Sequence, residues 1–96
     1  MIEPAPTISM HVPGILRIHC GGSSRLTLPA GNVRSALEHL ERHYPDLHRN
    51  LCEETGVVRR HLNVYVNTED TRFLRGLDTP LAPGDELTIL PAVSGG

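Results

Sequence analysis

The fold is decided by the stretch Pro83-Gly84-Asp85-Glu86-Leu87-Thr88-Ile89-Leu90. Proline, glycine and aspartate together are typical of a tight turn. The residues after the turn alternate polar and apolar side chains with period two, which predicts a strand over residues 85–90 with Leu87 and Ile89 facing the core. We therefore expect this strand to lead straight into the last residues of the sequence.

The sequence ends with two glycines. We predict that residues 93–96, Val93-Ser94-Gly95-Gly96, form a flexible tail on a single domain that spans residues 1–92. Glycine has no Cβ, so such a tail fits a passage too narrow for other residues. Four extended residues span roughly 12 to 14 Å, which suffices to reach a buried active site in another protein. A frayed chain end without a function is the alternative interpretation.

The composition describes one small domain with an aliphatic core. The sequence has 96 residues, 39% of them hydrophobic, with one Phe, two Tyr and no Trp. The formal net charge of −2 argues against a nucleic-acid partner, which would require clustered basic residues. We see neither a signal-peptide pattern nor a stretch of membrane-spanning length, so we expect a cytoplasmic location and no membrane partner.

Lysine is absent, and all nine basic residues are arginine. A GC-rich coding sequence is one explanation. The other is that a chain whose C-terminus becomes an activated acyl group benefits from the lack of amines that would capture it. The sequence leaves both explanations open.

Cysteine and histidine residues offer few candidates for a chemical site. Cys20 and Cys52 fall in no metal-binding or redox spacing, so we expect reduced thiols. His39 and His43 are four residues apart on a predicted helix, a spacing that can hold a metal, but no third ligand accompanies them. We interpret them as part of a solvated helix face and expect no bound metal. No glycine-rich phosphate loop is present, so we expect no cofactor on this chain.

The rest of the chain combines short strands with one main helix. Alternating patterns predict strands over residues 7–12, 24–28 and 61–67, and a short edge strand over 71–74. Residues 15–20 fit either a short helical turn or irregular chain. The predicted helix begins after an N-cap at Asn32, ends before Pro45 and carries one apolar stripe, and a further turn is compatible with residues 46–51. The stripe consists of Val33, Ala36, Leu37, Leu40 and Tyr44.

This order of elements predicts an α+β domain. A mixed sheet of four to five strands with one main helix packed on one face provides two layers around a core. A right-handed crossover through the helix sets the third or the last strand parallel to the first. The arrangement is the β-grasp, or ubiquitin-like, fold.

Several short motifs give the sequence a family resemblance. Together with the Pro-Gly-Asp turn, the apolar strand and the terminal Gly-Gly, the chain resembles the MoaD/ThiS family of prokaryotic sulfur carriers, and is most similar to its CysO type. The resemblance runs from about Thr7 to Gly96, and position 94 is Ser where the pattern has Ala. The motifs are Val64-Tyr65-Val66-Asn67, Glu69-Asp70, Arg72-Phe73, Gly76-Leu77 and Leu87-Thr88-Ile89-Leu90-Pro91-Ala92-Val93.

The resemblance implies a carrier and not an enzyme. An E1-like adenylyltransferase and sulfurtransferase would use ATP to activate the carboxylate of Gly96, next to Gly95, and would convert it to a thiocarboxylate. In the CysO type, the sulfur goes to the aminoacrylate that a pyridoxal-phosphate (PLP) cysteine synthase forms from O-phosphoserine. A zinc-dependent JAMM-type peptidase would then release cysteine. ATP and PLP belong to these partner enzymes.

The strand pattern also suggests where a partner binds. If Leu87 and Ile89 face the core, Leu90 lies on the opposite face of the sheet, and so does Tyr65 on the neighbouring strand. Exposed apolar groups often mark interfaces, although single ones are normal. We predict that Tyr65 and Leu90 bind partners, together with Pro91, Val93 and Ser94, which lead into the glycines.

Three other functions remain open. Within the same class, the chain could be the small subunit of molybdopterin synthase or a sulfur carrier for thiamine or a secondary metabolite. A second class is a ubiquitin-like modifier that forms amides with lysines of target proteins. The third is a plain β-grasp interaction domain whose last residues have no role.

Overall fold

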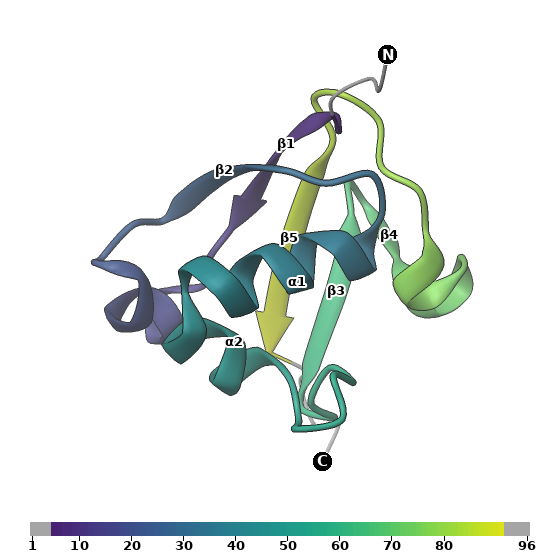
Figure 1. The fold of residues 1–96 in the computed structure, drawn as a ribbon. Helices are drawn as coiled ribbons and strands as arrows, with labels where there is room; N and C mark the ends of the chain where they lie inside the picture. Colours follow the sequence, from purple (N-terminus) through teal and green to yellow (C-terminus); the bar gives the residue numbers. More distant parts are fainter. Residues whose placement is uncertain (1–4, 92–96) are drawn as a thin grey trace.

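A computed structural model gives the structure of residues 5–91 (Figure 1). The strands are β1 (Thr7–His11), β2 (Arg25–Pro29), β3 (Leu62–Val66), β4 (Glu69–Asp70) and β5 (Glu86–Pro91). The helices are α1 (Val33–His43), α2 (Pro45–Leu51) and the 3₁₀ helices η1 (Gly14–Cys20), η2 (Thr71–Phe73) and η3 (Gly76–Asp78).

The five strands form one mixed sheet in the order β2-β1-β5-β3-β4. β5 lies in the centre, parallel to β1 and antiparallel to β3, while β2 and β4 are the edges. Figure 1 shows α1 crossing one face of the sheet, with α2 next to it. The predicted β-grasp is confirmed, and of the two strands that the sequence left open as the parallel neighbour of the first, it is the last one, β5, that pairs with β1.

α1 begins and ends where the sequence predicts. Asn32 is the N-cap, and it forms a capping box with Ser35: the Ser35 N–H donates to Asn32 Oδ1 at 2.8 Å, and the Asn32 N–H donates to Ser35 Oγ at 3.2 Å. Tyr44 ends the helix before Pro45, which starts α2 as its first residue. α2 is a separate two-turn helix that buries Leu47 and Leu51.

The core lies between the sheet and the two α-helices and is almost entirely aliphatic. Ile8, Met10, Leu40, Leu87 and Ile89 are all at most 1% exposed. Tyr44 and Tyr65 are half-buried and Phe73 is exposed, so the aromatic residues contribute little to the core. The prediction of a core built from Leu, Ile and Val is confirmed.

The predicted edge strand over residues 71–74 is wrong. The edge strand β4 is shorter and earlier, at Glu69–Asp70, and Thr71–Phe73 forms the 3₁₀ helix η2. The reason is the Asp70 carboxylate, which accepts a hydrogen bond from the Arg72 N–H at 2.9 Å and so caps a helical turn. Residues 15–20, which the sequence left open, belong to η1.

Candidate functional site

The candidate site is built around the exit of β5. Leu87 and Ile89 anchor this strand in the core at 1% exposure each, and neighbouring strands pair with both of its sides. Because β5 is the central strand, the position of Pro91, its last residue, is fixed by the sheet. Val93, Ser94, Gly95 and Gly96 lie outside the described residues, so their roles stay predictions, as does the domain boundary at residue 92.

The turn before β5 is held by a small polar network. The Asp85 N–H donates to the Ala82 carbonyl at 3.0 Å, and Gly84 has φ +84°. Proline followed by a glycine with positive φ is a type II turn. The Asp85 carboxylate accepts from the Ala82 N–H at 2.8 Å and from Asn67 Nδ2 at 3.2 Å. The network fixes where β5 begins and therefore its register against β3.

Tyr65 and Leu90 lie on the same face of the sheet, as the sequence predicts. Tyr65 pairs with Thr88, and Leu90 pairs with Asn63, so the two side chains are diagonal neighbours on the face opposite α1. Leu90 is 41% exposed and Tyr65 is half-buried. The two side chains are therefore neighbours on one accessible face of the sheet, as predicted, and their role in partner binding stays a prediction.

Pro91 lies at the rim of a pocket of about 470 Å³. η1, α2, the segment before β3 and the end of β5 all contribute to this pocket, which we call the Pro91 pocket. Its lining residues are Ile15, Leu16, His19, Arg49, Asn50, Arg59, His61, Leu62 and Pro91. The structure thus places Pro91, a residue of the predicted site, next to Ile15, Leu16 and His19 of η1, which the sequence analysis did not select.

η1 exposes two large apolar side chains. Ile15 is 78% exposed and Ile18 is 82% exposed, whereas Leu16 and Cys20 of the same helix are buried. In a 3₁₀ helix, side chains three residues apart lie one above the other, so Ile15 and Ile18 share a side. A seven-residue segment is too short to show this period, and only the unusual Ile-Leu-Arg-Ile composition between two turns could have indicated it.

The two thiols are poor candidates for sulfur chemistry. Cys52 is 2% exposed, and burial raises its pKa to about 11, against the lowering effect of Arg59. It is therefore a neutral thiol at physiological pH. The single S–H of the buried Cys20 can donate to the carbonyl of Ser23, 3.3 Å from Sγ, or to that of Arg17, 3.6 Å away. Cys20 lies on η1 and is a buried packing residue.

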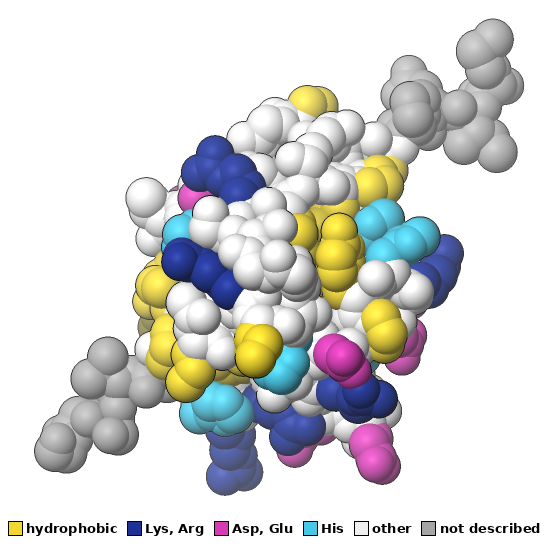
Figure 2. Space-filling model, turned by 90° about the vertical axis from the view of Figure 1, so that its left-hand side faces the viewer, with side chains coloured by type: hydrophobic (Ala, Val, Ile, Leu, Met, Phe, Trp, Pro, Cys, Tyr) yellow, Lys and Arg dark blue, Asp and Glu magenta, His cyan; other side chains and the backbone are white. Residues whose placement is uncertain are grey.

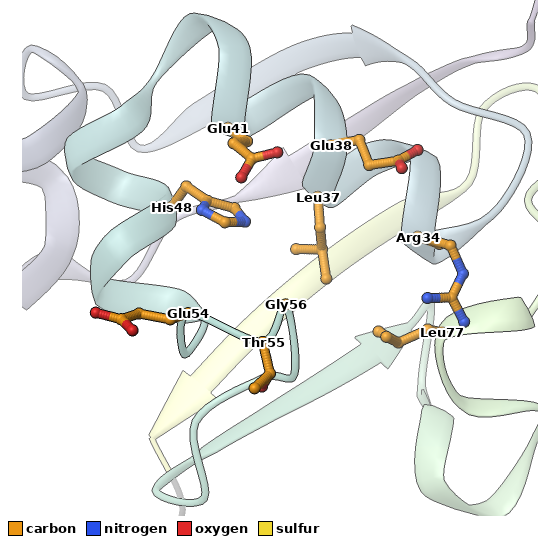
Figure 3. Close-up of a pocket in the computed structure, with 9 residues that line it drawn as sticks. All are labelled: Arg34, Leu37, Glu38, Glu41, His48, Glu54, Thr55, Gly56 and Leu77. Carbon is orange, nitrogen blue, oxygen red and sulfur yellow. The ribbon is translucent and has the colours of Figure 1, made fainter.

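A second pocket, of about 260 Å³, lies between α1, α2 and the loop after α2 (Figure 3). Figure 3 shows that its carboxylates do not converge: Glu41 lies near His48, whereas Glu38 and Glu54 point away from it in different directions. Between residues 5 and 91, no group of three or more His, Cys, Asp or Glu side chains is placed to hold a metal ion.

His39 and His43 stack on α1 with ring centroids 4.3 Å apart. Burial lowers the pKa of His39, as do the neighbouring His43 and Arg42. The absence of a resident metal on this pair stays a prediction.

Among the described helices, none has the length and apolar character needed to cross a membrane.

The fold and the register of β5 define the class: this is a ubiquitin-like β-grasp domain whose central strand leads to the last residues of the sequence. The chain belongs to the ThiS family, whose profile matches residues 11–96.

Relatives of known name support this assignment. The sulfur carrier protein CysO of Mycobacterium tuberculosis is 38% identical over 91 residues, which cover 93% of this chain and 98% of that protein. Its crystal structure superposes with a TM-score of 0.82 over 90% of this chain and 99% of that one.

A chain in the crystal structure of the Amycolatopsis orientalis BexX/CysO complex has the same TM-score, 0.82, and 38% identity, and covers 93% of this chain and 99% of its own length. The small archaeal modifier protein 3 of Haloferax volcanii is 38% identical over 64 residues, 67% of this chain and 68% of that protein.

Proposed function

We propose that this chain is a sulfur carrier for cysteine biosynthesis and acts as a co-substrate of other enzymes. The observation that carries the proposal is the similarity to a protein named as a sulfur carrier, at 38% identity across 98% of that protein's length. The sequence also ends with Gly95-Gly96, and Gly96 lies five residues after Pro91, the last residue of β5. The body of the domain positions this end, and the partner enzymes supply the catalytic groups.

The chemistry requires activation of the terminal carboxylate. A C-terminal carboxyl group has a pKa of about 3.3 to 3.7, so at neutral pH it is an anion that resists nucleophiles. In the proposed first step, a carboxylate oxygen of Gly96 attacks the α-phosphorus of ATP on an E1-like enzyme, and pyrophosphate leaves. A sulfur nucleophile then attacks the carbonyl carbon of the acyl-adenylate and displaces AMP. The product is a thiocarboxylate, whose anionic sulfur is a good nucleophile.

The proposed acceptor is the aminoacrylate that a PLP-dependent cysteine synthase forms from O-phosphoserine. The sulfur bonds to the β-carbon of the aminoacrylate, and a zinc-dependent JAMM-type peptidase hydrolyses the link to Gly96 and releases cysteine. The similarity to CysO favours this acceptor over those of a molybdopterin synthase subunit or a thiamine carrier. The similarity to the chain in the BexX/CysO complex is compatible with a carrier that also delivers sulfur to a second acceptor.

Activation of Gly96 can be measured as pyrophosphate release when the chain is mixed with its E1-like enzyme, ATP and sulfide. We expect release with the chain as it stands, and loss of release when Gly96 is deleted or when an alanine is added after it. Both variants leave residues 5–91 unchanged, so unfolding is not the expected cause of a loss. Equal release from all three proteins would contradict the proposal.

A ubiquitin-like modifier is the second candidate, favoured by the similarity to a small archaeal modifier protein. It uses the same adenylate but a lysine amine as acceptor. Peptides from the host proteome with an isopeptide remnant ending in Gly95-Gly96 on lysine would support this function.

A further inference from the structure

Exposed apolar side chains lie next to a pocket near the end of β5. The Pro91 pocket lies beside η1, where Ile15 and Ile18 expose most of their apolar surface. Figure 2, which views this side of the molecule, shows hydrophobic side chains at the lower left with histidine and arginine side chains next to them. Single exposed apolar residues are normal, but two on one side of a short helix beside a pocket form a patch.

The length of the last segment limits where a partner can sit. Residues 92–96 span at most about 17 Å when extended. Any enzyme that acts on Gly96 must place its reacting atoms within that distance of Pro91. The surface around its channel therefore contacts the domain near Pro91, and the Pro91 pocket and η1 lie within that part of the domain.

The charges of this surface indicate the chemistry of the partner. The Pro91 pocket is lined by Arg49, Arg59, His19 and His61 and by no Asp or Glu, although the whole chain has a net charge of −2. Arg49 is paired with Asp46, which does not line the pocket, so Arg59 and the two histidines supply most of its basic character. Arg59 is held in place, because its Nε and Nη2 donate to the Arg49 carbonyl at 3.0 and 2.9 Å. An apolar centre with a basic rim is complementary to an apolar side chain flanked by carboxylates.

We infer that η1 and the Pro91 pocket together dock the enzyme that adenylates Gly96, and that this enzyme inserts an apolar side chain flanked by carboxylates beside Ile15 and Ile18. The inference rests on the proposed function and adds a second surface to the sheet face of Tyr65 and Leu90. η1 is anchored by buried Leu16 and Cys20, so it presents its exposed isoleucines on a fixed support.

The test is a titration of the full chain into the adenylating enzyme, with Kd measured by calorimetry. We expect the double variant Ile15→Ser, Ile18→Ser to raise Kd about tenfold, because both side chains lose buried apolar contacts in the complex. His61→Glu, which places a carboxylate in the pocket, should also raise Kd. The matched control is Phe73→Ser: Phe73 is 86% exposed but does not line the Pro91 pocket, so its Kd should not change.

Each other outcome overturns the inference. An unchanged Kd for both the isoleucine and His61 variants, with pyrophosphate release still dependent on Gly96, removes the docking surface and leaves the proposed function standing. Absence of pyrophosphate release from the unmodified chain removes both. If the isoleucine variant changes only the chain's own oligomeric state in light scattering, the occupant is a second copy and not the enzyme.

Discussion

Asp70 shows how one side chain sets the local structure at the edge of the sheet. Its side chain is 7% exposed, and its carboxylate accepts from the backbone N–H of Arg72 and from Arg72 Nη2, both at 2.9 Å. These hydrogen bonds hold the pKa of Asp70 below its ordinary value of 3.8, although burial acts in the opposite direction. The carboxylate thus ends β4 and begins η2 at once.

Replacement of Asp70 should reveal this role through pH. Asp70→Asn removes the charge and should lower the free energy of unfolding at pH 7 by about 1 kcal/mol, since water screens the exposed Arg72 side of the pair. Because the folded-state pKa is depressed, the ionised carboxylate stabilises the fold fully above about pH 5, and this stability is lost as the pH falls through the folded-state pKa. Urea unfolding at pH 7 and pH 2.5 measures the difference.

A matched control is Asp78→Asn. Asp78 pairs with Arg34, but both side chains are more than half exposed, so the free energy of unfolding should change little. If the Asp70 variant lost the same stability at both pH values, the ion pair would not be the cause.

At the scale of elements, the turn into β5 sets the register of the central strand. Gly84 has φ +84°, a conformation that side chains with a Cβ rarely adopt. Gly84→Ala should therefore lower the free energy of unfolding by about 1 to 2 kcal/mol, as measured by urea denaturation. Gly31→Ala is the control, because Gly31 has open space around it and no positive φ. Equal effects of the two substitutions would show that the turn is not under this constraint.

The elements that sequence reasoning predicted correctly are those with a long, repeated pattern. The strands around Met10, Val64 and Leu87 alternate buried residues with more accessible ones, and α1 has a full apolar stripe and a capping Asn32. Such patterns predict which residues are buried, and the structure buries those residues. The crossover rule limited the strand parallel to β1 to the third or the last strand, and the structure shows that it is the last, β5.

The elements that it missed are short and depend on single hydrogen bonds or on a different period. Thr71–Phe73 forms a helical turn because the Asp70 side chain caps it. The alternation of polar and apolar residues does not reveal such a hydrogen bond. η1 has a period of three over only seven residues, so its exposed Ile15 and Ile18 could not be distinguished from core residues. The Pro91 pocket joins four segments and is a product of the fold alone.

The whole molecule combines a packed β-grasp domain with a sequence that ends in two glycines. Its core is aliphatic, its central strand is β5, and the surface around Pro91 is apolar with a basic rim. Neither thiol is available as a sulfur carrier, since both are buried and the pKa of Cys52 is raised to about 11. The Gly96 carboxylate is therefore the group on which the proposed carrier function depends.

The most direct measurement is the intact mass of the protein purified from its own host, compared with protein from the same host without the E1-like enzyme. We predict that the first sample contains a species in which sulfur replaces one oxygen, that fragmentation places this sulfur at Gly96, and that the species is missing from the second sample. A chain that carries only oxygen at Gly96 in both samples, while the host makes cysteine from O-phosphoserine, would contradict the account.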